Sequence, residues 1–148
     1  MKSMTDKTMN RYLDISNELL VRKYLDISKS LSDIFPDQKT EEERILKYVL
    51  YSSAIIIKMM KYKVDNNGQF FLEITDFLIK KILNDSASFS FIDEKDKEVM
   101  EVWSKNLLFN NEYTFRIIRL LRKRGFVVNL ANDEKEPGRY KLSIRLDF

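Results

Sequence analysis

Residues 112–130 read EYTFRIIRLLRKRGFVVNL, a basic segment that passes through a glycine into an apolar run. The first part has helical composition and periodicity, so we expect a helix over residues 111–124. Gly125 is the residue type that most often supplies the left-handed conformation after a helix. The apolar residues that follow predict a strand over residues 126–130. This stretch therefore predicts a helix that leads directly into a β-hairpin.

The partner strand of this hairpin is expected at residues 139–146. The segment between the strands, residues 132–138, reads NDEKEPG, which has the composition of a turn and is rich in acidic side chains. Such a turn would be repelled by phosphate, so we expect the strand rather than the turn to contact a negatively charged partner. Basic residues alternate along that strand and share one of its faces, namely Arg139, Lys141 and Arg145.

The composition of the 148 residues favours helix, since only 3 Gly and 2 Pro occur. The chain is 44% hydrophobic and 12% aromatic, which is enough for a sizeable core. We therefore predict a mainly α fold with a small β-hairpin, which places the protein in the α+β class.

Cysteine and histidine are both absent from the sequence. Disulfides, thiol nucleophiles, imidazole bases and ordinary zinc sites are thereby excluded, so we expect a protein that is not an enzyme and that holds no metal or cofactor. No signal-peptide pattern opens the sequence, and the apolar run 48–57 lies between two lysines and is too short to cross a bilayer. We expect a soluble, cytoplasmic protein with no membrane partner.

Two long helices are predicted before the basic region. The first covers residues 8–35 and stops at Pro36, which cannot continue a helix. The second begins after Thr40, because Thr40 and Glu43 match the capping-box pattern, and it continues to the turn signal at residues 65–68. Because the link between the two helices is short, they most simply form an antiparallel hairpin.

This hairpin, residues 1–66, is expected either to cover the core of the remaining domain, residues 67–148, or to form a homodimer. The reason is the second helix, whose apolar residues extend beyond a single stripe. A helix of that kind is either central within one protomer or paired with a second one, and the sequence leaves both arrangements open. The additional apolar residues are Tyr48, Tyr51, Ile55, Met59 and Tyr62.

Three further elements are expected between this hairpin and the basic helix. A short helix is predicted over residues 74–83, and the alternation of serines with apolar residues over 88–92 predicts a short strand. Asp93 is a good N-cap for a helix over residues 94–107. Trp103, the only tryptophan, lies on the apolar side of that helix and is expected in the core.

The expected order from residue 73 onward is helix, strand, helix, basic helix, strand, turn and strand. This order resembles the winged helix-turn-helix superfamily of DNA-binding proteins over about the last 75 residues of the chain. The segments that carry the resemblance best are residues 120–128, LLRKRGFVV, and residues 139–142, RYKL. The resemblance implies a recognition helix that ends in a basic residue and a glycine, followed by a wing whose returning strand opens with an arginine.

The basic helix itself suits such a role. On a helical wheel its apolar residues fall on one side, whereas Arg116, Arg119 and Lys123 lie within about 60° on the other. Arginine can make bidentate contacts with guanine, and Arg122 and Arg124, at the flanks, suit contacts with phosphate. The same pattern also describes an ordinary solvated helix. The predicted DNA-binding residues are Arg116, Arg119, Arg122, Lys123, Arg124, Arg139, Lys141 and Arg145.

The distribution of charge agrees with a basic C-terminal region. Residues 112–148 contain nine Lys or Arg against five Asp or Glu, whereas residues 1–111 contain 17 against 18. The net charge of +3 is therefore a local excess and not a general property of the chain. Clustering of this sort can mark an acidic partner such as nucleic acid, and a few units of charge are also common on solvated surfaces.

Two functions from different classes follow. The first is a sequence-specific DNA-binding protein, a small transcriptional regulator or a replication or maintenance factor of a phage or mobile element, which binds double-stranded DNA as a dimer. The second is an adaptor or inhibitor that binds a protein partner, such as a viral or phage antagonist of a host system. Its contact surfaces would be the acidic turn and Tyr48, Tyr51 and Tyr62. A helical bundle whose hairpin caps one end remains a third possibility.

Overall fold

The computed structural model of the chain describes residues 29–85, 87–106, 112–135 and 139–146. The fold belongs to the α+β class, as predicted, with helices and a small antiparallel sheet of three strands. The predicted helix 8–35 lies outside the described residues up to residue 28; residues 29–34 are helical. The other elements are α2 (Glu41–Asn67), β1 (Phe71–Ile74), α3 (Asp76–Asn84), α4 (Glu94–Asn106), α5 (Glu112–Lys123), β2 (Phe126–Asn132) and β3 (Tyr140–Leu146).

The long helix α2 begins where the sequence predicted, but it extends through residues 65–67 of the expected turn and ends at Asn67. Thr40 is its N-cap, and its side-chain oxygen accepts a hydrogen bond from the backbone N–H of Glu43 at 3.2 Å. Gly68 follows its last residue with φ of 64°, a left-handed conformation that glycine adopts without strain. Its N–H donates to the carbonyl of Val64, which closes the last turn.

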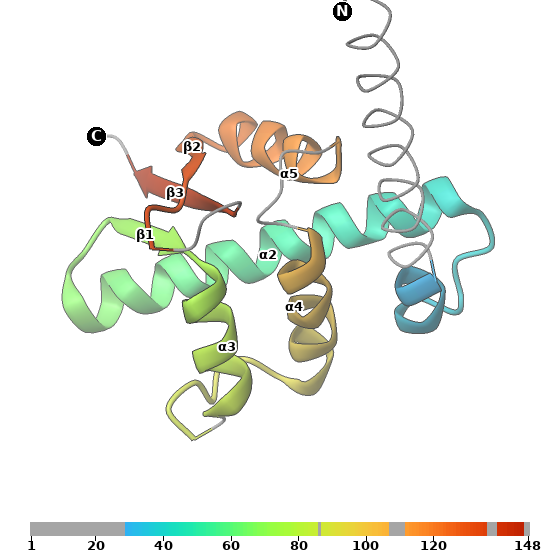
Figure 1. Cartoon of the computed structure of the whole chain (residues 1–148), viewed down its shortest axis with the longest axis horizontal. Helices are drawn as coiled ribbons and strands as arrows, with labels where there is room; N and C mark the ends of the chain where they lie inside the picture. Colours follow the sequence, from blue (N-terminus) through green and yellow to red (C-terminus); the bar gives the residue numbers. More distant parts are fainter. Residues whose placement is uncertain (1–28, 86, 107–111, 136–138, 147–148) are drawn as a thin grey trace, which may run out of the picture.

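Helix α2 is the centre of the molecule (Figure 1). It contacts α5 and β1 on one side and α4 on the other, so both sides of the helix are buried. This explains why its apolar residues extend beyond one stripe. Most of them are buried within one chain, including Tyr48, Ile55, Ile56 and Met59.

Two polar contacts fix α4 against α2. The indole nitrogen of Trp103, which is fully buried as predicted, donates to the Ser52 hydroxyl at 2.9 Å. The carboxylate of Asp96 accepts from the Lys58 ammonium at 2.7 Å. Asp93 caps α4 as predicted, because its side chain accepts from the Asp96 N–H at 2.7 Å. The buried indole and carboxylate are therefore both satisfied, as groups removed from water must be.

The sheet has the strand order β1-β3-β2, and both pairings are antiparallel. Its buried face packs towards α2 and includes Ile74 of β1, Val128 of β2 and Ile144 of β3. The opposite face carries more exposed residues, among them Phe71 and Arg145, which are paired in register. Because β3 is central, it has a hydrogen-bonded neighbour along both edges.

The predicted strand at residues 88–92 is wrong, since residues 87–92 form turns. The alternation of polar and apolar residues there has another cause. Phe91 stacks on Tyr62 of α2 with ring centroids 4.4 Å apart, Phe89 meets Phe91 at 6.3 Å, and Ile92 is buried. The apolar side chains of this segment thus pack against α2 and one another, and the segment pairs with no described strand.

The third strand of the sheet is instead β1, which the sequence analysis missed. Its last residue, Ile74, was assigned to the start of the following helix, whereas α3 begins at Asp76 after the N-cap Thr75. Thr75 accepts a hydrogen bond from the backbone N–H of Leu78 at 3.1 Å. A four-residue strand shows too little alternation to be recognised, and its pairing with β3 becomes apparent only in the folded chain.

One hydrophobic core extends from Leu31 to Ile144 along the chain and includes residues of the helices and of the sheet. The division of the chain at residues 66 and 67 stays a prediction. Within the described residues, no helix is both long and apolar enough to cross a bilayer.

We predict that Asp96→Ala lowers the free energy of unfolding by about 2 kcal/mol, measured by urea denaturation. The carboxylate is almost fully buried, and its loss leaves the Lys58 ammonium and the Asp93 N–H without their acceptor. Because the Lys58 side chain is 41% exposed, water can replace part of the interaction, so the loss is smaller than for a fully buried pair. Asp65→Ala, at an exposed position of α2, is the control and should change stability by less than about 0.5 kcal/mol.

Candidate nucleic-acid interface

Helix α5 presents the two sides that the helical wheel predicted. Thr114, Ile117, Ile118 and Leu121 are buried against the core, together with Tyr113. The helix ends at Lys123, and Gly125 takes φ of 95°, so the chain can turn directly into β2. The glycine is therefore what allows a strand to follow the basic helix without a longer loop.

The N-terminal half of this basic side is partly neutralised. The Arg116 guanidinium donates to the Glu42 carboxylate on α2 at 2.8 Å and to Glu112 at 3.3 Å. These hydrogen bonds raise the pKa of Arg116 and hold its side chain against α2. Arg119 also reaches Glu112 at 3.3 Å, but its side chain is 65% exposed. Arg116 is thus paired with a carboxylate of α2 at the surface, whereas Arg119 is more accessible.

The C-terminal end of α5 is different. Arg122 donates twice to the carbonyl oxygen of Val128, at 2.8 and 3.3 Å, and so ties the end of the helix to β2. Lys123 and Arg124 beside it are exposed and form no ion pair with a described residue. Cations at a helix C-terminus also interact favourably with the helix dipole.

Arg139 lies at a junction of three elements. It precedes β3, and its guanidinium donates to the carboxylate of Asp76 at 3.2 Å and to the carbonyl of Ser104 at 2.8 Å. Asp76 is buried and is also paired with Lys80 at 2.7 Å. Arg139 therefore connects the start of β3 to α3 and α4, a structural position that removes it from the predicted basic surface.

The other two predicted residues of this strand share one face of the sheet, as expected. Lys141 pairs with Glu73 of β1 at 2.8 Å, and this contact raises the pKa of Lys141. Arg145 is exposed and lies opposite Val127, near the start of β2, the strand that follows α5. The positive charge of the strand is thus neutralised at Lys141 and accessible at Arg145.

The eight predicted residues do not form one continuous positive surface. Arg139 and Lys141 are paired with carboxylates near the turn, whereas Arg145 lies at the other end of the hairpin, opposite Val127, where β2 follows the C-terminus of α5. The acidic residues Asp133 and Glu134 lie in the turn itself. The candidate interface is therefore the C-terminal end of α5 with the adjoining end of the sheet, and its residues are Arg119, Lys123, Arg124 and Arg145.

A groove of about 320 Å³ between α2 and α5 was not predicted. Two leucines of α2, Leu46 and Leu50, are 55% and 43% exposed there. The groove is lined by Leu46, Val49, Leu50, Arg116, Arg119, Leu120 and Lys123. A sign of it is present in the sequence, because Leu46 and Leu50 lie one turn apart and occupy the same side of the helix.

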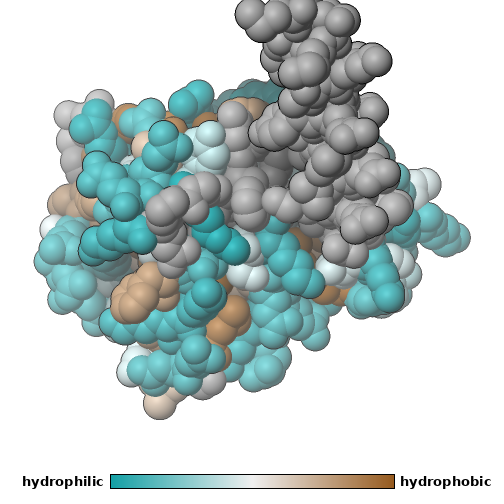
Figure 2. All heavy atoms as spheres, in the orientation of Figure 1, coloured by the Kyte–Doolittle hydropathy of each residue, from teal (hydrophilic) through white to brown (hydrophobic). Residues whose placement is uncertain are grey.

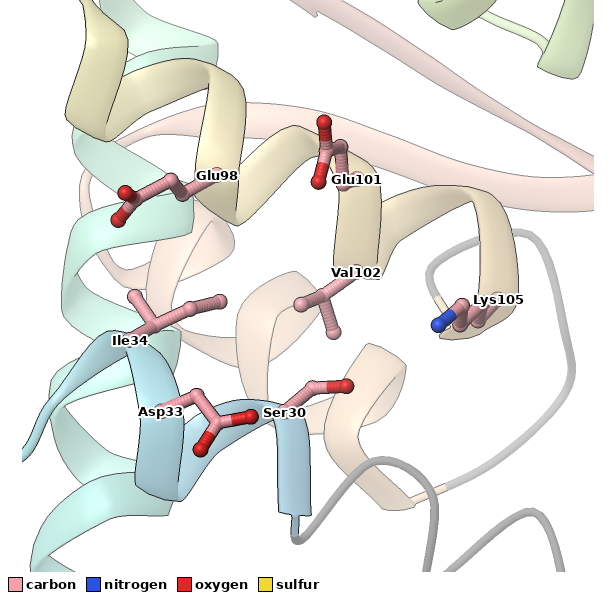
Figure 3. A pocket seen from close by; sticks show the side chains of 7 residues that line it. All are labelled: Ser30, Asp33, Ile34, Glu98, Glu101, Val102 and Lys105. Atoms are coloured by element: carbon pink, nitrogen blue, oxygen red, sulfur yellow. The ribbon is translucent and has the colours of Figure 1, made fainter.

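A second hollow of about 270 Å³ lies between residues 29–34 and α4 (Figure 3). Asp33, Glu98 and Glu101 line it, with Lys105 as the single cation. Three carboxylates against one ammonium make this hollow unsuitable for phosphate. The face of the molecule in Figure 2, coloured by hydropathy, is largely hydrophilic with small separate hydrophobic patches.

The tyrosines that would form a protein-binding surface are mostly engaged inside the molecule. Tyr48 is fully buried and meets Tyr113 edge-to-face at 6.4 Å, so its assignment to an exposed surface is wrong. Tyr62 stacks on Phe91, and Tyr51 packs against Phe35 at 6.2 Å. Burial and the neighbouring carboxylate of Asp96 raise the pKa of Tyr51 to about 12. These rings contribute mainly to internal packing.

No protein-family model matches the chain, and neither a curated protein nor a solved structure shows significant similarity to it.

We predict that Arg139→Ala lowers the free energy of unfolding by about 1–3 kcal/mol, because it leaves the Ser104 carbonyl without its arginine donor and the buried Asp76 carboxylate with Lys80 as its remaining charged partner. Arg145→Ala, at an exposed position on the same strand, should change stability by less than about 0.5 kcal/mol. Chemical denaturation of both variants measures the difference. Equal losses would contradict the structural role assigned to Arg139.

Proposed function

We propose that the chain is a DNA-binding protein of the winged-helix type that acts by binding and not as an enzyme. The observation that carries this proposal is the group of exposed cations at the junction of α5 and the sheet. Lys123, Arg124 and Arg145 form no ion pair with a described residue, so their charge is available to phosphates. Double-stranded DNA is the partner that such a cluster at the end of a basic helix suits best.

The order of the elements supports the winged-helix part of the proposal. A short strand, β1, follows the central helix and pairs with β3, the returning strand of the hairpin, and α5 leads directly into β2. The order departs from the expected one because two helices, α3 and α4, separate β1 from α5. In the proposed arrangement α5 is the recognition helix and enters the major groove.

Base recognition falls to Arg119 in this proposal. Its side chain is 65% exposed, and its contacts with Glu112 and the Phe115 carbonyl are long, at 3.3 and 3.4 Å. Such contacts are easily exchanged for the two acceptors on the major-groove edge of guanine. Arg116 contributes less, because its shorter bond to Glu42 holds it against α2. Lys123, Arg124 and Arg145 are left to contact phosphates.

A small protein of this kind acts by occupying a site on DNA. We therefore extend the proposal to a transcriptional regulator, or a replication or maintenance factor of a phage or mobile element. Binding as a dimer would allow two copies of α5 to read two half-sites one helical turn apart.

We predict salt-dependent binding of the protein to double-stranded DNA of about 20–30 base pairs, measured by fluorescence anisotropy. Arg124→Ala and Arg145→Ala should each reduce the slope of log affinity against log salt by about one and weaken binding to all sequences alike. Arg119→Ala should instead weaken binding by about 1–3 kcal/mol at the preferred sequence and relax base preference.

The matched control is Lys81→Ala, which removes an exposed lysine on α3, on the other side of α2 from α5 (Figure 1). Its affinity for DNA should equal that of the unmodified protein. Binding that does not depend on salt, or that all four variants weaken equally, would rule out this interface.

A further inference from the structure

We propose that the groove between α2 and α5 binds an acidic amphipathic helix of a partner protein. This goes beyond DNA binding, because it assigns a protein partner to exposed leucines that DNA does not require. Two features of the groove lead to this proposal, namely its apolar floor and the cations along one rim. Other ligands would match only one of these two features.

The floor of the groove is built from leucines of two helices. Leu46 and Leu50 project from α2 one turn apart, Leu120 comes from α5, and Val49 lies between them. Exposed leucines in a row on one helix, facing a leucine of another, form the kind of surface that accepts the apolar face of a third helix. A partner with apolar residues at positions i, i+3, i+4 and i+7 would cover this floor.

The rim on the α5 side carries positive charge. Arg116, Arg119 and Lys123 line the groove, and the carboxylates facing them are Glu42 of α2 and Glu112 of α5. Both carboxylates lie at the Arg116 end, where they hold that guanidinium. The Lys123 end carries uncompensated charge, with Arg119 one turn before it and largely exposed. A carboxylate of the partner would therefore lie between Arg119 and Lys123.

Other occupants match only part of this surface. A nucleic acid could use the cations, but its phosphates gain nothing from the exposed leucines. A second copy of the chain in a symmetric contact would present the same groove lining, which holds three cations and no carboxylate to pair with them. An acidic amphipathic helix matches both the leucines and the cations.

The groove and the proposed DNA interface share Arg119 and Lys123 but are otherwise separate. The leucines belong only to the groove, whereas Arg124 and Arg145 belong only to the DNA interface. A bound helix would therefore cover two of the cations that DNA needs. The partner helix and DNA would therefore compete for these cations. Binding of each ligand can be weakened separately by its own set of substitutions.

The experiment uses the full chain and a synthetic helical peptide of about four turns, with leucines at i, i+3, i+4 and i+7 and glutamates along one flank. A second peptide replaces the glutamates with lysines. Fluorescence anisotropy is expected to show saturable binding of the acidic peptide and at least a tenfold weaker affinity for the basic one. In backbone amide NMR spectra, shifts caused by the acidic peptide should centre on α2 residues 42–50 and on α5.

Leu46→Gln and Leu50→Gln should each weaken the affinity for the acidic peptide at least fivefold. Both should leave the affinity for DNA unchanged, because neither substitution alters charge. Both side chains are exposed, so the variants should fold. Phe77→Gln is the matched control, since it removes a 73% exposed apolar side chain from α3 and should not affect the peptide. Arg145→Ala should weaken the affinity for DNA and leave the affinity for the acidic peptide unchanged.

Any of three binding results would overturn the proposal: no saturable binding of the acidic peptide, equal binding of both peptides, or equal losses of affinity in Leu50→Gln and Phe77→Gln. Shifts confined to the Arg124 and Arg145 end would also overturn it, because they would report only charge attraction to the DNA interface. Since the groove variants and the Arg145 variant respond to different ligands, failure of the peptide proposal leaves the DNA proposal separately testable.

Discussion

The fold depends on one helix that is buried from two directions. Helix α2 contacts α5 and the sheet on one side and α4 on the other, so it cannot be removed or rotated without exposing both halves of the core. Trp103 shows how closely the packing is specified, because its indole nitrogen needs the hydroxyl of Ser52 at one position on α2. A buried donor without its acceptor is costly, so the contact fixes the register of α4 along α2 as well as adding stability.

Two buried carboxylates pair with basic side chains. Asp96 holds Lys58 between α2 and α4, and Asp76 holds Arg139 and Lys80 where β3 meets α3. Because a buried charge must be paired, the basic residues near the turn serve the fold, while those at the other end of the hairpin stay in water. The same division leaves Lys123 between two surfaces, the groove and the end of the sheet. The two proposed ligands, a partner helix and DNA, would therefore compete for this lysine without any change of fold.

Much of the local structure was predictable from sequence. Thr40, Asp93 and Gly125 act as predicted at the ends of their helices, and the apolar side of α5 is the buried one. The errors concern short segments. Residues 88–92 alternate as a strand does but pack on α2, whereas the four residues of β1 form a strand only because β3 lies beside them. In both cases the local pattern is too short to outweigh a contact between residues far apart in sequence.

The sequence by itself determined helices α2, α4 and α5, the caps Thr40 and Asp93, and the presence of a basic helix followed by a hairpin, because these depend on neighbours within a turn or two of the chain. Only the tertiary structure decided the role of each basic residue. Arg139 and Arg145 belong to the same predicted strand. Arg139 nevertheless binds the buried Asp76 carboxylate, whereas Arg145 faces solvent. Likewise, Leu46 and Leu50 belong to an apolar stripe in sequence, but no described element covers them. The physical reason is that charge pairing and burial depend on which distant elements are brought together, and a single sequence does not encode that locally.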